Sequence, residues 1–201
     1  MKMSALDRVL LFITVFLAAY QIVIGIDNLS TAPIIAYTIA FGVLLLAALL
    51  LIILGLDVLD SPIVVIVSTI IPISLSLGLV WEHLASYRTL YLIFAIIGFA
   101  AVTFTRMIPM QNRVPTITIA IVHGISGMII FLLPIILSAR GLMKPAFSLV
   151  GIGGALIGIE GLLLSFFRTG KPILSREVNL KIFPGLLLLM TIFFVTGFKL
   201  G

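Results

Sequence analysis

Hydrophobic residues form seven long stretches, separated by short polar segments, over almost the whole 201-residue chain. About 20 helical residues cross a hydrocarbon core about 30 Å thick, and each stretch is close to that length. None of them has the period-two alternation of a membrane β-strand. The pattern predicts an all-α integral membrane protein, a bundle of about seven transmembrane helices in one domain over residues 1–201. The expected helices are residues 9–26, 33–56, 62–84, 87–105, 114–138, 145–167 and 182–198.

Capping residues agree with several of these helix starts. Ser4 is followed three residues later by Asp7, which resembles a capping box. Prolines occupy first-turn positions, where the missing N–H costs nothing: Pro33, Pro62, Pro115 and Pro145. The stretch 9–26 is long for the hydrophobic part of a signal peptide and has no clear small-x-small cleavage site, so we expect it to remain as a helix.

Composition excludes several classes of protein. Hydrophobic residues make up 62% of the chain and charged residues 9%, and the mean hydropathy is +1.40, values foreign to a soluble domain. The net charge of +5 is spread through the gaps between stretches, as lipid headgroups and topology require, and predicts no nucleic-acid partner. The absence of cysteine excludes disulfides and thiolate metal sites, and no carboxylate cluster or nucleotide-binding motif predicts a metal or cofactor.

Lysine and arginine predict the orientation in the membrane. With the N-terminus inside, eight basic residues lie on the inner side and four on the outer side, and the positive-inside rule favours this arrangement, with the C-terminus outside. The inner residues are Lys2, Arg8, Arg106, Arg113, Arg168, Lys171, Arg176 and Lys181, and the outer residues are Arg88, Arg140, Lys144 and Lys199.

Two ionisable residues interrupt the hydrophobic stretches. His123 lies about 14 Å from the inner edge of the fifth expected helix, and Glu160 about 10 Å from the same edge in the sixth. Intramembrane ionisable groups are costly and usually face protein or a watery cavity. We therefore expect His123 and Glu160 to form a proton-responsive pair, with transport or binding that depends on pH between about 5 and 8. The alternative is that each group only bonds a backbone carbonyl and stabilises helix packing.

The third expected helix carries a second polar feature. Ser68, Pro72 and Ser76 fall in one sector of the helix, and Pro72 frees the carbonyl of Ser68. Such a kinked stripe is tolerated at membrane depth where it is buried or lines a cavity, so these residues are candidate cavity lining. Trp81 and His83 lie at the outer end of the helix, where amphipathic rings anchor helices at the interface.

Parts of the sequence resemble two known families of membrane protein, and its two histidines raise the question of a haem. The positions of Pro33 and Pro145 make helices one to three and five to seven candidate parallel repeats joined by helix four, which resembles the three-plus-one-plus-three layout of small sugar transporters. Gly124-Ile-Ser126-Gly127 resembles the Gly-x-Ser-Gly motif of rhomboid intramembrane proteases, but no histidine follows position 123 to activate the serine. His83 and His123 differ by about 18 Å in their expected depth, whereas both ligands of one haem must reach the same iron. This difference argues against a haem held by the two histidines.

These features favour a small solute or proton-coupled transporter of the plasma membrane. Its expected partners are the lipid bilayer, a small solute or proton, and other membrane subunits or further copies of the chain. The alternatives are a structural or quinone- or haem-handling subunit of a larger complex and, last, an intramembrane enzyme. We assign no catalytic residue. His123 and Glu160 are the predicted proton- or ligand-binding residues.

Overall fold

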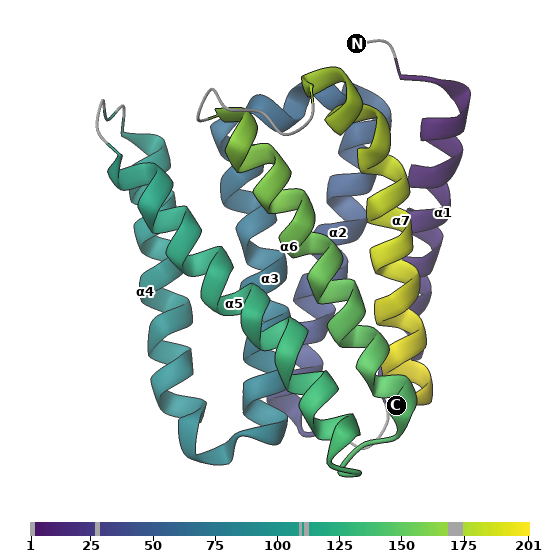
Figure 1. The fold of residues 1–201 in the computed structure, drawn as a ribbon, viewed down its shortest axis with the longest axis vertical. Helices are drawn as coiled ribbons and strands as arrows, with labels where there is room; N and C mark the ends of the chain where they lie inside the picture. The colour runs from purple at the N-terminus through teal and green to yellow at the C-terminus, as the bar shows by residue number, and fades with distance from the viewer. Residues whose placement is uncertain (1–2, 27–28, 109, 111–112, 169–174) are drawn as a thin grey trace.

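The computed structural model describes residues 3–26, 29–108, 110, 113–168 and 175–201, without the side chains of Asp60, Arg176 and residues 160–168. Within these ranges every regular element is a helix (Figure 1). The α-helices are α1 (Ala5–Ile24), α2 (Thr31–Leu54), α3 (Pro62–His83), α4 (Arg88–Met107), α5 (Val114–Ala139), α6 (Ser148–Arg168) and α7 (Arg176–Leu200). Short 3₁₀ turns precede α3, α4 and α6: η1 (Leu56–Asp60), η2 (Ala85–Tyr87) and η3 (Pro145–Phe147).

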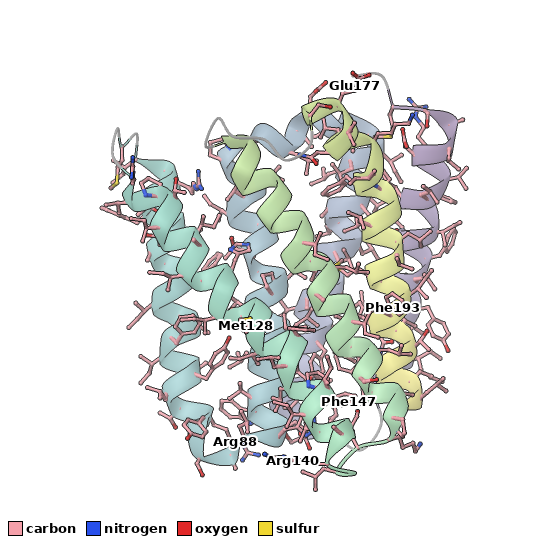
Figure 2. The ribbon with its side chains drawn as sticks, in the orientation of Figure 1. Arg88, Met128, Arg140, Phe147, Glu177 and Phe193 are labelled. Carbon is pink, nitrogen blue, oxygen red and sulfur yellow. The ribbon has the colours of Figure 1, made fainter. Side chains whose placement is uncertain are left out.

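Six of the described helices are long and apolar enough to cross a membrane: α1, α2, α3, α4 with its preceding turn, α5 and α7. The turn η3 and the part of α6 with described side chains form a shorter apolar segment, Pro145–Ile159. Charged side chains lie at the two ends of the bundle, with Arg88 and Arg140 at one end and Glu177 at the other, while Met128 and Phe193 lie between them (Figure 2). The fold is consistent with an all-α membrane bundle.

Helix ends differ from the sequence predictions most where a cap extends a helix into polar sequence. The Asp7 N–H donates to Ser4 Oγ at 3.1 Å and the Ser4 N–H to Asp7 Oδ2 at 2.8 Å, which confirms the capping box and starts α1 at Ala5 rather than residue 9. Ser175 Oγ accepts from the Val178 N–H, so α7 starts at Arg176 rather than 182. Charged residues at these starts had suggested loops. The other ends agree within three residues.

Six helices form a closed ring, and α4 lies outside it. Around the ring α1 contacts α2, α2 contacts α3, α3 contacts α5, α5 contacts α6, α6 contacts α7, and α7 contacts α1. The α4 helix packs across α3 and α5, at the left of Figure 1. Neighbours in sequence run antiparallel, whereas the pairs α3 with α5 and α1 with α7 run in the same direction. The ring therefore divides into two triplets, α1–α3 and α5–α7, which meet at two parallel helix contacts.

Side chains from around the ring fill its interior. At the lower end of Figure 1 the Phe198 ring lies with its centroid 4.7 Å from that of Tyr37 and 6.2 Å from those of Phe41 and Phe147. The α3 helix is the most enclosed, with 61% of its most apolar segment buried against 22% for α5. Of the candidates on α3, Pro72 and Ser76 are buried and Ser68 is half-buried, while α5 presents much of its surface outward.

Glycines bring α5 and α6 into backbone contact at one level. A Cβ at Gly151 would lie 2.5 Å from the Phe131 carbonyl oxygen, and one at Gly154 would lie 2.7 Å from an Ile130 methyl group. Without a hydrophobic force between helices in lipid, such close van der Waals contact is a main source of helix association. A Cβ at Gly158, farther along the same stripe, would meet no described atom within 4 Å.

These contacts predict different effects on stability for two similar substitutions. Gly151→Ala should lower the thermal unfolding midpoint of the purified protein, with a loss of about 1–3 kcal/mol of stability, because the added methyl group forces the α5 backbone away. Gly158→Ala is the matched control and should leave the midpoint unchanged or slightly raised. Equal midpoints for the two variants would contradict the close α5–α6 contact.

Candidate functional site

Most buried hydroxyl groups of the described chain are satisfied within their own helix. Each donates to the carbonyl one turn earlier: Thr14 to Leu10, Thr69 to Val65, Thr105 to Ala101 and Thr191 to Leu187, over 2.7–3.0 Å. This is the usual way to keep a hydroxyl in an apolar environment, and it indicates a structural role. Hydroxyl groups that bond across helices are therefore better candidates for a site.

Three such hydroxyls, here named the hydroxyl cluster, join α3, α4 and α5: Ser76, Tyr91 and Ser126. The Tyr91 hydroxyl donates to Ser76 Oγ at 2.7 Å, and Ser76 Oγ donates to the carbonyl of Pro72 at 2.5 Å or of Ile73 at 3.0 Å. Since the Tyr91 proton is then used, Ser126 Oγ donates to Tyr91 Oη over 3.3 Å, a long and weak bond. Ser76 and Ser126 have no exposed surface, and Tyr91 is 7% exposed.

The periodicity of α4 places Tyr91 in this cluster. Its buried face consists of Tyr91, Ala95, Gly98, Val102 and Thr105, at alternating spacings of four and three. A Cβ at Gly98 would lie 3.1 Å from a methyl group of Val122 on α5, so small residues on this face let α4 approach the ring closely. The sequence analysis missed Tyr91 because a tyrosine near a helix end suggests an interface anchor. The alternating spacing of these five residues is the sequence signal that could have placed Tyr91 on the buried face.

The predicted cavity-lining residues lie on α3, but their hydroxyl groups bond the backbone. Ser68 Oγ donates to the Val65 carbonyl at 3.1 Å, and Ser76 belongs to the hydroxyl cluster. Pro72 is buried in the interior of α3, and its ring removes the backbone bond to the Ser68 carbonyl. The polar stripe thus combines a proline interruption with an interhelical hydrogen bond one turn farther on. Its role in a solute path stays a prediction.

His123 lies three residues before Ser126 on α5 and has an unsatisfied ring nitrogen. Its Nδ1 is buried and makes no hydrogen bond to any described residue, although the Ile119 carbonyl lies beside the ring and the Arg106 side chain acts on it electrostatically. An imidazole nitrogen in an apolar environment normally finds a partner, because an unsatisfied buried polar group costs about 1–3 kcal/mol. A hydrogen-bonding group of a polar ligand or of another side chain could supply this partner.

The predicted partner of His123 lies outside the described side chains. The structure places residue 160 in the backbone of α6, which packs against α5, and the Glu160 side chain is among those not described. The proton-responsive pair of His123 and Glu160 therefore stays a prediction.

The two residues predicted as interface anchors make contacts at the lower end of the bundle. Arg88 Nε donates to the Trp81 carbonyl at 2.6 Å, and the Arg88 guanidinium lies 5.9 Å from the centre of the Trp81 ring. The His83 ring lies 5.4 Å from that of Phe147, which is labelled toward the lower end of the bundle in Figure 2. His83 is the last residue of α3, whereas His123 is in the tenth position of α5, near the middle of the bundle.

One small cavity, of about 20 Å³, lies at α1 and α2, away from the hydroxyl cluster. Among the described residues no three His, Cys, Asp or Glu side chains group as metal ligands. In the same residues the hydroxyl of Ser126 bonds Tyr91, and no imidazole hydrogen bond activates it. Among the described residues the arrangement therefore offers hydroxyl groups and an imidazole for hydrogen bonding, without a serine paired to a base.

Comparison with known proteins yields no match to a protein-family model, a curated protein or a solved structure. The fold and site define the class as an all-helical, membrane-compatible bundle with a buried hydroxyl cluster and an unsatisfied histidine. Function is therefore argued from these residues.

The hydroxyl cluster predicts a measurable loss on removal of one oxygen atom. Tyr91→Phe should lower the free energy of unfolding by about 1 kcal/mol, in the range of interhelical hydrogen bonds in membrane proteins. The hydroxyl would no longer donate to Ser76, and Ser126 would lose its acceptor. Thermal or denaturant unfolding of the purified protein would measure it, with Tyr87→Phe at an exposed position as control. In a double-mutant cycle, Ser126→Ala should cost less in the Tyr91→Phe background than alone. Additive effects would contradict the bond.

Proposed function

We propose that this protein is a small solute or proton-coupled transporter with seven membrane crossings, its N-terminus inside, in the cell membrane. The observation that carries the proposal is the ring of two parallel triplets with α4 as the external connection. Transporters are commonly built from repeated helix units, with substrate sites near the middle of the membrane where the units meet. In this chain the contact between α3 and α5 is such a meeting point, and it contains the hydroxyl cluster.

Matched prolines support the repeat. Pro33 lies in the first turn of α2 and Pro72 inside α3, 39 residues apart, and Pro145, just before α6, and Pro184, inside α7, have the same spacing. Both Pro72 and Pro184 are buried. An interior proline removes a backbone hydrogen bond and lets a helix bend at that point. The proposed transport movement is a rocking of one triplet against the other, with α3 and α7 bending at these prolines.

His123 is the proposed proton-binding residue, with Glu160 as its partner on α6. It belongs to the first helix of the second triplet and lies one turn from Ser126 of the hydroxyl cluster. Because its Nδ1 has no partner among the described residues, gain or loss of a proton would change how the ring interacts with its surroundings. Proton binding would thus act close to the contact between the triplets.

Transport by the reconstituted protein tests the proposal. Proteoliposomes containing a pH-sensitive dye are given gradients of sugars, amino acids and monocarboxylates, one class at a time. At least one of these classes should change the internal pH. His123→Ala should abolish the pH change, because the proton site is lost, while exchange of the radiolabelled solute across the membrane continues.

Two results would contradict the proposal in different ways. An unchanged pH response in His123→Ala would remove this residue as the proton site. Absence of any solute or proton movement by the folded wild-type protein across the panel would favour a subunit of a larger complex, which should then co-purify with partner membrane proteins from its native membrane.

The proposed orientation has its own test, since the chain contains no cysteine. A cysteine at Ser86, in the turn before α4, should react in intact cells with a membrane-impermeant maleimide. A cysteine at Ser61, in the turn before α3, should react only after the cells are opened. The reverse labelling pattern would show that the N-terminus is outside.

A further inference from the structure

The helices α5 and α6 touch at one level and separate one turn farther toward the end of the bundle where α5 begins. At the close contact, a Cβ at Gly154 of α6 would lie 3.0 Å from the backbone nitrogen of Phe131 on α5. One turn farther on, α6 carries Gly158 and α5 carries Gly127, at matching levels because the two helices run antiparallel. A Cβ at either of these two glycines would meet no described atom within 4 Å, so a gap separates the helices there.

The gap opens sideways to the hydrocarbon around the bundle. Gly158 itself is exposed, and so is Gly124, which lies three residues before Gly127. The exposed side chains at the rim of the gap are all apolar: Ile121, Ile125 and Met128 of α5 and Ile159 of α6. Met128 is labelled at about the middle of the bundle in Figure 2. Hydrocarbon chains of the bilayer can therefore enter the gap.

The depth of the gap matches the chains of one leaflet. Gly127 lies 13 residues after Val114, the first residue of α5, which is about 20 Å along the helix axis. Because α5 runs obliquely across the bundle in Figure 1, the gap is less deep than this. One leaflet supplies half of a hydrocarbon core about 30 Å thick, or about 15 Å. The end of an acyl chain thus reaches the gap when its headgroup lies at the start of α5.

Basic residues lie where that headgroup would be. Arg113 is the N-cap of α5 and is exposed, and Arg106 in the last turn of α4 is close enough to His123 to act on it electrostatically. Neither α4 nor α5 contains an acidic residue. The described acidic side chains of this end belong to α1, η1 and α7: Asp7, Asp57 and Glu177. Arginines next to a membrane helix attract anionic headgroups, so the charge here favours an anionic lipid over a zwitterionic one.

We infer that an anionic phospholipid binds along α5, with its phosphate at Arg106 and Arg113 and the end of one acyl chain in the gap at Gly127 and Gly158. Glycine at both positions leaves the room that the chain occupies, whereas Gly154 brings the helix backbones together below it. This lipid site adjoins His123 of the proposed proton site, but lipid binding there does not require the protein to be a transporter.

Photo-crosslinking of the full-length protein in phosphatidylcholine liposomes tests the inference. The liposomes contain a trace of phosphatidylglycerol or of phosphatidylcholine with a diazirine at the end of one acyl chain, and mass spectrometry locates the labelled peptides. The phosphatidylglycerol probe should label the gap roughly tenfold more than the phosphatidylcholine probe, and Arg106→Gln with Arg113→Gln should remove this difference. Gly127→Leu should abolish labelling of the gap because the added side chain fills it. Gly42→Leu is the matched control, since a Cβ at this α2 glycine also meets no described atom within 4 Å, and should retain the labelling.

Equal labelling of the gap by the two probes would overturn the inference, because the arginines would then select no headgroup. Unchanged labelling in Gly127→Leu would also overturn it, since the chain would then lie elsewhere. If Gly127→Leu does not fold, as judged by its circular dichroism, Gly158→Leu decides in its place, and Arg113→Gln alone replaces an unfolded double arginine variant. None of these measurements requires transport, so failure here is separate from failure of the proposed function.

Discussion

The structure depends on the requirement that polar groups in a hydrocarbon environment find partners within the protein. Four buried threonines meet this requirement by hydrogen bonds to carbonyl groups of their own helices. Such bonds do not fix the position of one helix relative to another. The hydroxyl cluster meets it differently, since the oxygen atoms of three helices satisfy one another in a single chain of bonds. Ser76, Tyr91 and Ser126 therefore fix the relative positions of α3, α4 and α5 as well as satisfying their own hydroxyl groups.

Close packing supplies the remaining constraint, because helices in lipid gain little from burying apolar surface against one another. The Tyr37 ring lies against Gly78 of α3, where a Cβ would come within 2.5 Å of it, and Gly151 and Gly154 bring α6 onto α5. Each contact joins neighbours within a triplet. Glycine thus makes the triplets compact internally, while the contact between α3 and α5 contains hydrogen-bonding side chains. The hydrogen-bonded contact between α3 and α5 can be broken and formed again more easily than the close glycine contacts within each triplet.

The sequence alone was sufficient for the class of fold and for the approximate helix positions, because long apolar runs leave few alternatives. It was insufficient where a local interaction overrides composition. Polar residues before 182 suggested a loop, yet the Ser175 cap makes them the first turns of α7. For the site, His123 and Ser76 were found as polar residues in apolar stretches. Tyr91 was not, since it looks like an ordinary residue near a helix end and only its place on a buried face distinguishes it.

The two contacts between the triplets are unequal, and this bears on how the proposed movement would proceed. At the contact of α1 with α7, the Lys199 ammonium lies 5.8 Å from the centre of the Tyr20 ring, an interaction that tolerates sliding because the ring face is broad. At the contact of α3 with α5, the link runs through Tyr91 of α4, and its bond to Ser126 is longer by 0.6 Å than its bond to Ser76, at 3.3 Å against 2.7 Å. Rocking of the triplets would break the weaker bond first. The α4 helix would then stay with α3, and α5, which carries His123, would be the helix that moves.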